Sequence, residues 1–477
     1  MERDILGTNR KALRINLNPK IYGTIAEIGG GQEVARNFFL AGGASGTIAK
    51  SISAYDKLFS DRFYNKNRPG RYVSEERLCK MLIAEYDELI SVLSEKRSDD
   101  TTYFAFANTV ATLNYKKDNY SHGWMGMRFQ QKPNAQPNEV LFHVNLKEND
   151  TALQQQSLGV LGINLIFACF NSTDRPVEFI RSLMDNLDKD RIEITMIRMR
   201  GPDLNYVDNR LLGVQLVKNG MTPAMMFDRN GKVQQPADML YKKNVLLFRG
   251  SFRPIHKVGF DMLRASYRIF KRDEDYDRDN TLALCEISVN NLLGKGDIDE
   301  RDFLERVDLL NGMGQNVMIS TFREYYKLVD YFSQFKIINL RVVIGIPTFI
   351  NVVNYRYYTD LKGGILEAFG KLFIDNMKVY IYPTIPAVSL DERKPVGKLL
   401  TSKDIVISDQ YKDLYSYLLK NKKIIDITNV KKEWLYINSS NVLKMIRNGT
   451  PGWEEMVPNY VEKEIKEKGL FGYNRDA

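Results

Sequence analysis

The feature that most constrains the fold is a regular alternation of apolar, strand-like segments and amphipathic, helix-like segments after residue 244. Such alternation is typical of a parallel β-sheet whose strands are joined by crossover helices. We therefore expect one α/β domain in this part of the chain. The predicted strands are 244–252, 281–289, 316–321, 341–346 and 378–383, and the predicted helices are 257–270, 302–312, 324–335 and 364–373.

The same alternation begins once before, after residue 140. The segments 140–146, 161–170 and 191–199 have the apolar patterns of strands, and 176–187 has a helical pattern. The preceding residues look mainly helical, with a helix that Ser74 can cap. We therefore expect a mainly helical, Gly-rich region at 1–139, an α/β region at 140–243, and a separate α/β domain at 244–477.

Cysteine and histidine are too scarce and too scattered for a side-chain metal site. The 477 residues include three cysteines without a C-x-x-C pair and three histidines without metal-ligand spacing. No apolar run reaches the ~18 residues of a membrane helix, and the first residues lack an apolar signal core. These observations predict a cytoplasmic protein with reduced cysteines, no bound zinc and no membrane partner.

The net charge is mildly positive. It is +9, from 68 basic and 59 acidic residues, which slightly favours anionic ligands such as nucleotides. Nucleic-acid binding is disfavoured because the chain has no basic stripe interleaved with aromatic residues. The sequence leaves open whether the chain forms a homo-oligomer.

Two glycine clusters near the N-terminus, 29–31 and 42–46, each precede a helix-like run. Glycines there can let backbone N–H groups approach a phosphate, or they can allow tight turns and close packing. Neither cluster has the spacing of a P-loop or of the dinucleotide fingerprint, so both interpretations stay open. Polar segments at 130–139, 271–280 and 389–398 are expected to be loops.

The strongest functional signal begins where the first strand of the C-terminal domain ends. In a parallel sheet, ligands bind at the carboxyl ends of the strands. Gly250 and Ser251 follow the strand, and they allow the backbone to approach a phosphate. His256 comes next, at the predicted start of a helix, where backbone donors favour anions.

A second signal lies almost two hundred residues later, in 437–473. Ser439 and Ser440 are typical of a helix N-terminus, where hydroxyls and free amides can hold an anion. Lys444 lies on the helix that follows. This segment and the turn at 250–256 are expected to meet at the carboxyl edge of the sheet.

These two segments resemble the nicotinamide and nicotinate mononucleotide adenylyltransferases, and 345–358 is similar to that family's G-x-D-T segment. The resemblance covers roughly 245–477, with the motifs in the family's order. The whole chain also resembles a family of long bacterial proteins that carry the same name. The residues that match the motifs are Gly250, Phe252, Pro254 and His256 in the first segment, and Ile437, Ser439, Gly449, Val457, Pro458, Val461, Ile465 and Leu470 in the second.

The resemblance implies a Rossmann-like nucleotidyltransferase domain. It implies transfer of the adenylyl group of ATP, with Mg²⁺, to nicotinate or nicotinamide mononucleotide, giving a dinucleotide and pyrophosphate. His256 would act on the transferred phosphate as a catalytic residue. The residues implied to bind the nucleotide and its phosphates are Gly250, Ser251, Phe252, Ser439, Ser440 and Lys444.

The departures from the family's motifs concern its catalytic groups. The family's second histidine falls on Gly259 or Phe260, its aspartate on Pro347, and its arginine on Leu443. Each donor lost from such a site costs ~3–4 kcal/mol of transition-state stabilisation. Lys257, Arg253 and Lys444 are candidates to compensate for the lost groups, and Arg253, inside the first motif, is the catalytic candidate to replace the arginine. The alternative is a catalytically degenerate nucleotide-binding scaffold or sensor, or a subunit of an assembly, so the sequence leaves open whether the protein is an enzyme.

Overall fold

The computed structural model describes residues 4–97, 99–273, 275–292, 299–386 and 398–474. The chain forms two compact units, Met1–Met225 and Met226–Ala477. The predicted loop at 389–398 lies outside the described residues except for its last residue.

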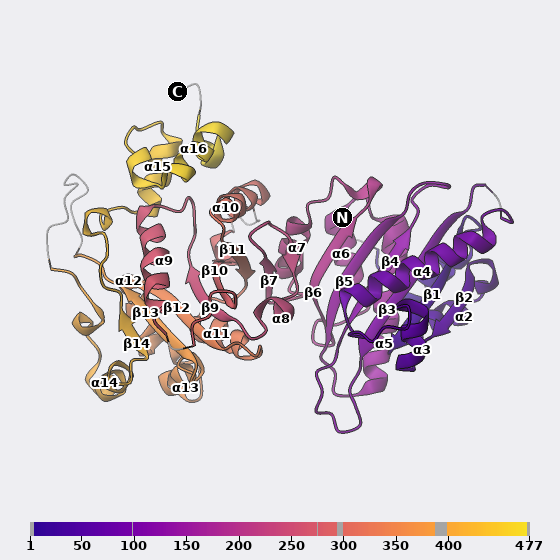
Figure 1. Cartoon of the computed structure of the whole chain (residues 1–477), viewed down its shortest axis with the longest axis horizontal. Helices are drawn as coiled ribbons and strands as arrows, with labels where there is room; N and C mark the ends of the chain where they lie inside the picture. Colours follow the sequence, from indigo (N-terminus) through magenta and orange to yellow (C-terminus); the bar gives the residue numbers. More distant parts are fainter. Residues whose placement is uncertain (1–3, 98, 274, 293–298, 387–397, 475–477) are drawn as a thin grey trace. The chain divides into compact units, whose positions relative to one another are not determined.

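The second unit is built on an eight-stranded sheet of order β14-β13-β12-β9-β10-β11-β7-β8 (Figure 1). From β14 to β11 neighbouring strands are parallel, as predicted. The chain builds one half outward from β9 through β10 to β11, and then crosses back to place β12 on the other side of β9. The strands are β7 (Ala224–Phe227), β8 (Val233–Gln234), β9 (Asn244–Arg249), β10 (Thr281–Ser288), β11 (Asn316–Ser320), β12 (Asn339–Gly345), β13 (Met377–Tyr382) and β14 (Ile424–Asp426).

Helices connect these strands, and the predicted helices are confirmed to within a few residues. Continuous apolar runs such as Val245–Phe248 form the central strands because the connecting helices bury both faces of a parallel sheet. The helices are α8 (Pro236–Leu240), α9 (Lys257–Phe270), α10 (Glu300–Gly312), α11 (Tyr325–Ser333), α12 (Ile346–Val352), α13 (Gly364–Leu372), α14 (Lys412–Lys420), α15 (Ser439–Arg447) and α16 (Asn459–Lys468).

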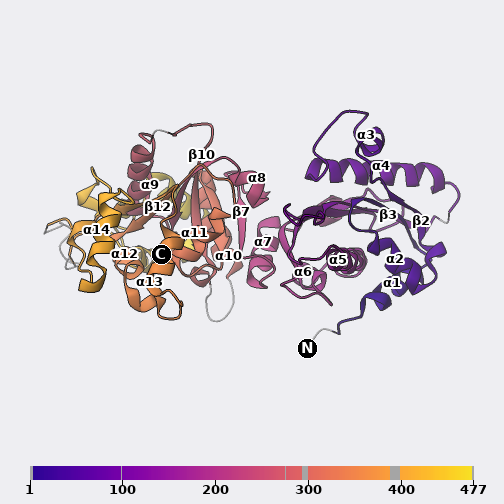
Figure 2. The same cartoon turned by 90° about the horizontal axis from the view of Figure 1, so that it is seen from below.

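The first unit contains a six-stranded mixed sheet of order β2-β1-β3-β4-β5-β6. Figure 2 shows α3 and α4 over one face of this sheet and α1, α2 and α5 over the other. The strands are β1 (Ile21–Gly29), β2 (Ile48–Ser53), β3 (Thr102–Ala111), β4 (His122–Phe129), β5 (Asn138–Leu146) and β6 (Ile192–Arg200). The helices are α1 (Thr8–Asn16), α2 (Glu33–Ala41), α3 (Lys57–Tyr64), α4 (Glu75–Leu93), α5 (Thr151–Asn171), α6 (Pro176–Leu183) and α7 (Asn209–Lys218).

The secondary structure of residues 1–139 differs from the mainly helical expectation, because β1 to β4 lie there beside the predicted helix capped by Ser74. β1 is buried on both faces and contains small residues such as Gly23 and Ala26, so its sequence shows no polar–apolar alternation. The division between the units falls inside β7, upstream of the expected boundary at 236–244. The short strands β7 and β8 extend the second sheet and gave no clear pattern in the sequence.

The predicted strand at 161–170 is wrong: these residues form the C-terminal half of α5. A short apolar run does not distinguish a buried strand from a buried helix, and here the helix starts ten residues earlier, where Asp150 accepts a hydrogen bond from the Leu153 N–H. α5 is the one helix among the described residues that is long and apolar enough to cross a membrane. Of its apolar window, 67% is buried inside the structure, as in a core helix.

A buried ion pair joins α1 to the rest of the first unit. The Lys11 Nζ lies 2.7 Å from Asp185 Oδ2 and 2.7 Å from Asn164 Oδ1 on α5, and both charged side chains are almost completely buried. A buried charge is tolerated only when it is paired and hydrogen-bonded. The pair therefore fixes α1 against α5 and the loop that follows α6.

Replacing Lys11→Met is expected to lower the free energy of unfolding by about 3–5 kcal/mol, because Asp185 is left buried without its cation. Lys20→Met is the matched control, since the Lys20–Asp100 pair is more than half exposed and such pairs contribute about 0–1 kcal/mol. Urea denaturation of both variants measures the difference. Equal effects of the two substitutions would contradict the role assigned to Lys11.

Candidate functional site

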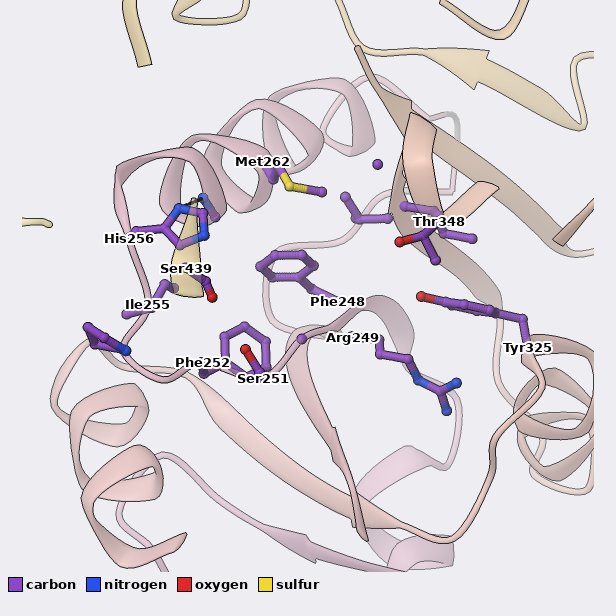
Figure 3. A pocket seen from close by; sticks show the side chains of 16 residues that line it. Phe248, Arg249, Ser251, Phe252, Ile255, His256, Met262, Tyr325, Thr348 and Ser439 are labelled. Atoms are coloured by element: carbon purple, nitrogen blue, oxygen red, sulfur yellow. Dashed lines mark hydrogen bonds between the residues drawn. The ribbon is translucent and has the colours of Figure 1, made fainter. Parts of the chain in front are cut away.

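A pocket of about 220 Å³ lies where the strand order of the second sheet reverses, between β9 and β12. Crossover connections diverge to opposite sides at such a point and leave a crevice at the carboxyl ends of the two strands. Residues after β9 and residues at the end of β12 line the pocket. Figure 3 shows His256 and Ser439 on one side, Thr348 and Tyr325 on the other, and the Phe248 ring between them.

A more open groove of about 560 Å³ adjoins this pocket and shares Arg249, Gly250, Tyr325 and Thr348 with it. Ser288, Asn290 and Arg323 complete the lining of the groove. Its walls therefore come from the ends of β9 and β10, the loop before α11, and the first turns of α11 and α12. Pocket and groove together reach the size range of small-molecule sites, ~300–1,000 Å³.

His256 caps α9 and lines the pocket. Its Nδ1 accepts a hydrogen bond from the Gly259 N–H at 3.3 Å, so Nδ1 carries no proton. Burial lowers the pKa of His256 to about 4. The ring is therefore neutral at pH 7, with its proton on Nε2, and it can offer a ligand one uncharged donor.

Arg253 does not reach the pocket. Its guanidinium forms an ion pair with Asp302, which also pairs with Arg306. Arg306 in turn donates to the Ser251 carbonyl at 3.0 Å. This network holds the turn after β9, in which Phe252 is buried with a φ of 48°, so Arg253 has a structural role here and is not placed to replace a lost catalytic arginine.

The second predicted segment reaches the pocket through Ser439 alone. Asn438 caps α15 by accepting from the Ser440 N–H at 2.9 Å. Ser440 and Lys444 are exposed and do not line the pocket. Successive helix positions are ~100° apart, which is why one serine faces the pocket and its neighbour does not. Of the other predicted residues, Gly250, Ser251 and Phe252 line the pocket.

Sequence reasoning missed Arg249 and Tyr325. The Arg249 guanidinium lies 2.5 Å from Glu286 and donates to the carbonyls of Phe322 and Arg323, each at 2.9 Å. Its charge is thus compensated within the protein. Burial raises the pKa of Tyr325 to about 12, so its hydroxyl stays protonated as a donor. No motif pointed to either residue, although Arg249 ends the strand that precedes the Gly250 motif.

The pocket offers little to hold a magnesium ion. No Asp or Glu is among the residues that line it, and Mg²⁺ is bound in proteins chiefly through carboxylates and substrate phosphates. The side chains therefore do not fit a resident magnesium site. Throughout the described residues, no group of three or more His, Cys, Asp and Glu is placed to hold a metal ion.

The first glycine cluster begins at Gly29, the last residue of β1, and precedes α2. At Gly31, with a φ of +128°, an added Cβ would lie 1.9 Å from the Asn108 Nδ2. Close packing against β3 therefore accounts for the absence of a side chain at this position. Whether the cluster also binds a ligand stays a hypothesis.

Comparison with known proteins gives no family for this chain: no family model matches it, and no curated protein matches it. Among solved structures, it is similar to a candidate nicotinate-nucleotide adenylyltransferase from Vibrio parahaemolyticus, with 12% identity and a TM-score of 0.26 over 49% of this chain and 97% of that one. It is also similar to the competence/damage inducible protein CihA from Agrobacterium tumefaciens, with 14% identity and a TM-score of 0.22 over 34% of this chain and 93% of that one. The fold assignment rests on the strand order and does not depend on these similarities.

The neutral state of His256 makes a testable link between pH and stability. In the unfolded chain this histidine takes up a proton near pH ~6.5, whereas in the folded protein it does so only near pH 4. Stability should therefore fall as the pH is lowered from about 6.5 to about 4, by about 1–3 kcal/mol from this residue. His256→Asn keeps a helix cap and removes the titration.

Chemical denaturation of the native protein and of His256→Asn at pH 7.5 and pH 4.5 separates this contribution from that of the carboxylates. The native protein is expected to lose more stability than the variant between the two pH values. An equal loss would show that His256 does not titrate as described.

Proposed function

We propose that the second unit binds a nucleotide in the pocket between β9 and β12 and acts as a catalytically degenerate nucleotide-binding scaffold or sensor. The observation that carries this proposal is the position of the pocket. It lies at the reversal of strand order, where doubly wound sheets bind nucleotides. The first motif segment and Ser439 of the second, almost two hundred residues apart, both line it.

The lining supplies apolar surface and neutral donors. Phe248, Ile255 and Met262 offer surface for a base, while His256, Ser439 and Thr348 offer polar atoms. Ligand pockets commonly combine an apolar lining with a few convergent polar groups. This combination suits a nucleoside or nucleotide better than a purely ionic ligand.

The same lining argues against efficient adenylyl transfer. That reaction needs cations or aligned donors around the transferring phosphate. Arg249 is the one cationic side chain that lines the pocket, and Glu286 compensates it. His256 is neutral, Arg253 is paired with Asp302, and Lys444 lies outside. The catalytic side chains of the family that this chain lacks are thus not replaced by neighbouring residues.

Adenylyl transfer from ATP to nicotinate or nicotinamide mononucleotide is the second candidate. It is favoured by one observation: His256 and Ser439 match the family's motifs and line the same pocket. In this alternative, Arg323 in the lining of the adjoining groove is the cation that could bind a second substrate. Magnesium would neutralise the phosphates of ATP when the substrate is bound.

Binding at this site can be tested with two neighbouring serines. Ser439→Ala should weaken nucleotide binding about tenfold, because a hydrogen bond to a charged group contributes ~1.5–3 kcal/mol. Ser440→Ala is the matched control and should bind as the native protein does. Calorimetric titration of the full-length variants with ATP and AMP measures both. Equal affinities, or no binding by the native protein, would contradict the proposed site.

Catalysis can be tested separately by pyrophosphate release from ATP and either mononucleotide with Mg²⁺ present. The scaffold proposal expects release no faster than without protein, and no effect of His256→Ala beyond a change in stability. The enzymatic alternative expects pyrophosphate release above the rate without protein. Replacing His256 should then lower kcat far more than it raises KM, since a donor aimed at developing charge acts mainly in the transition state. The two results exclude one another.

A further inference from the structure

Helix α3 in the first unit has its amphipathic character reversed. Its inward residues are polar: Ser60, Asp61 and Tyr64 are buried. Its outward face is apolar, and so is Tyr55, which lies two residues before the helix. The exposed fractions are 76% for Tyr55, 79% for Leu58, 48% for Phe59 and 52% for Phe63. We call these four residues the α3 apolar face.

The inward polar residues hold α3 firmly against α4. Arg77 pairs with Asp61 and donates to the Ser60 Oγ at 3.1 Å. The Tyr64 hydroxyl donates to Glu85 at 2.7 Å. Because these buried groups satisfy one another, the helix cannot rotate its apolar side inward without leaving charges unpaired. The exposure of the apolar face is therefore built into the fold.

Basic side chains lie in this helix and in the residues that follow it. Lys57, Arg62, Lys66, Arg68 and Arg71 are all exposed, and Asp56 is the single exposed acid from Tyr55 to Arg71. Among the described residues, Arg62, Lys66 and Arg68 have no carboxylate partner. The Asp56 carboxylate is already engaged, since it accepts from the Phe59 N–H and caps the helix. An apolar face with a basic border is complementary to an anionic, partly apolar surface.

We propose that α3 is a membrane-surface contact, which inserts its apolar face among the lipids of an anionic bilayer and sets its basic border against the phosphate headgroups. Interfacial helices combine these two features. Figure 2 shows α3 on the outer side of α4, away from the sheet, as a helix that meets a flat surface requires. A second copy of the chain fits less well, because a two-fold contact would bring the basic borders together.

The contact is weak and reversible, because a short helix buries few apolar side chains and lacks a second anchor. The earlier expectation of no membrane partner came from the absence of signal and membrane-spanning segments. A surface contact of this kind needs neither.

The test is cosedimentation of the full-length protein with vesicles of phosphatidylcholine and phosphatidylglycerol, compared with vesicles of phosphatidylcholine alone. Binding to the anionic vesicles that weakens at high salt is expected. Leu58→Asp should reduce it about tenfold or more, and Arg62→Ala about fivefold. The matched controls are Leu40→Asp on α2, whose side chain is 61% exposed, and Lys132→Ala in the β4–β5 loop; both should bind as the native protein does.

All four substitutions are at exposed positions, and thermal unfolding verifies that each variant is folded. No binding to anionic vesicles overturns the proposal, as does equal binding to both kinds of vesicle or an equal loss in Leu58→Asp and Leu40→Asp. The proposal is also overturned if the folded protein does not bind vesicles but crosslinks through α3 to an acidic peptide or to a second copy of itself. The α3 apolar face would then be assigned to that partner. The nucleotide site is not involved, so this result is independent of nucleotide binding.

Discussion

The reversal of strand order beside β9 is the constraint on which the rest of the second unit depends. Because β10 and β11 lie on one side of β9 and β12 lies on the other, the connections at the carboxyl ends of β9 and β12 diverge. The turn before α9 and the end of β12 then border the pocket between the two strands. The pocket is thus a consequence of topology, and the side chains at its rim decide what it holds.

Much of this unit could be predicted from the sequence because its signals are local. The central strands are continuous apolar runs, and α9 begins and ends at the predicted residues. The first unit was harder. β1 is buried on both faces, with small residues that give no alternation, and α5 is apolar all round, so its second half looks like a strand. Burial on every side removes the periodicity on which such predictions rest.

The candidate site could be predicted in position but only partly in composition. The motifs predicted that the turn at 250–256 and the start of α15 would meet, and residues of both line one pocket. Spacing does not report which way a side chain turns. Arg253 is adjacent to pocket residues, yet its charge is drawn to Asp302 on α10, a helix nearly fifty residues further along the chain. Ser440 follows Ser439 but lies about a quarter-turn further around the helix. Such differences depend on partners distant in sequence.

The capping of α9 by His256 connects stability to ligand chemistry. A histidine whose Nδ1 accepts a backbone N–H must stay neutral to keep that bond, and burial favours the same state. The residue that resembles a catalytic histidine is therefore fixed as a donor without charge. Adenylyl transfer, by contrast, develops charge on phosphate that a cation or several aligned donors must meet. Without a free cation in the pocket lining, the geometry that makes the helix start stable also makes the site better suited to binding than to transfer.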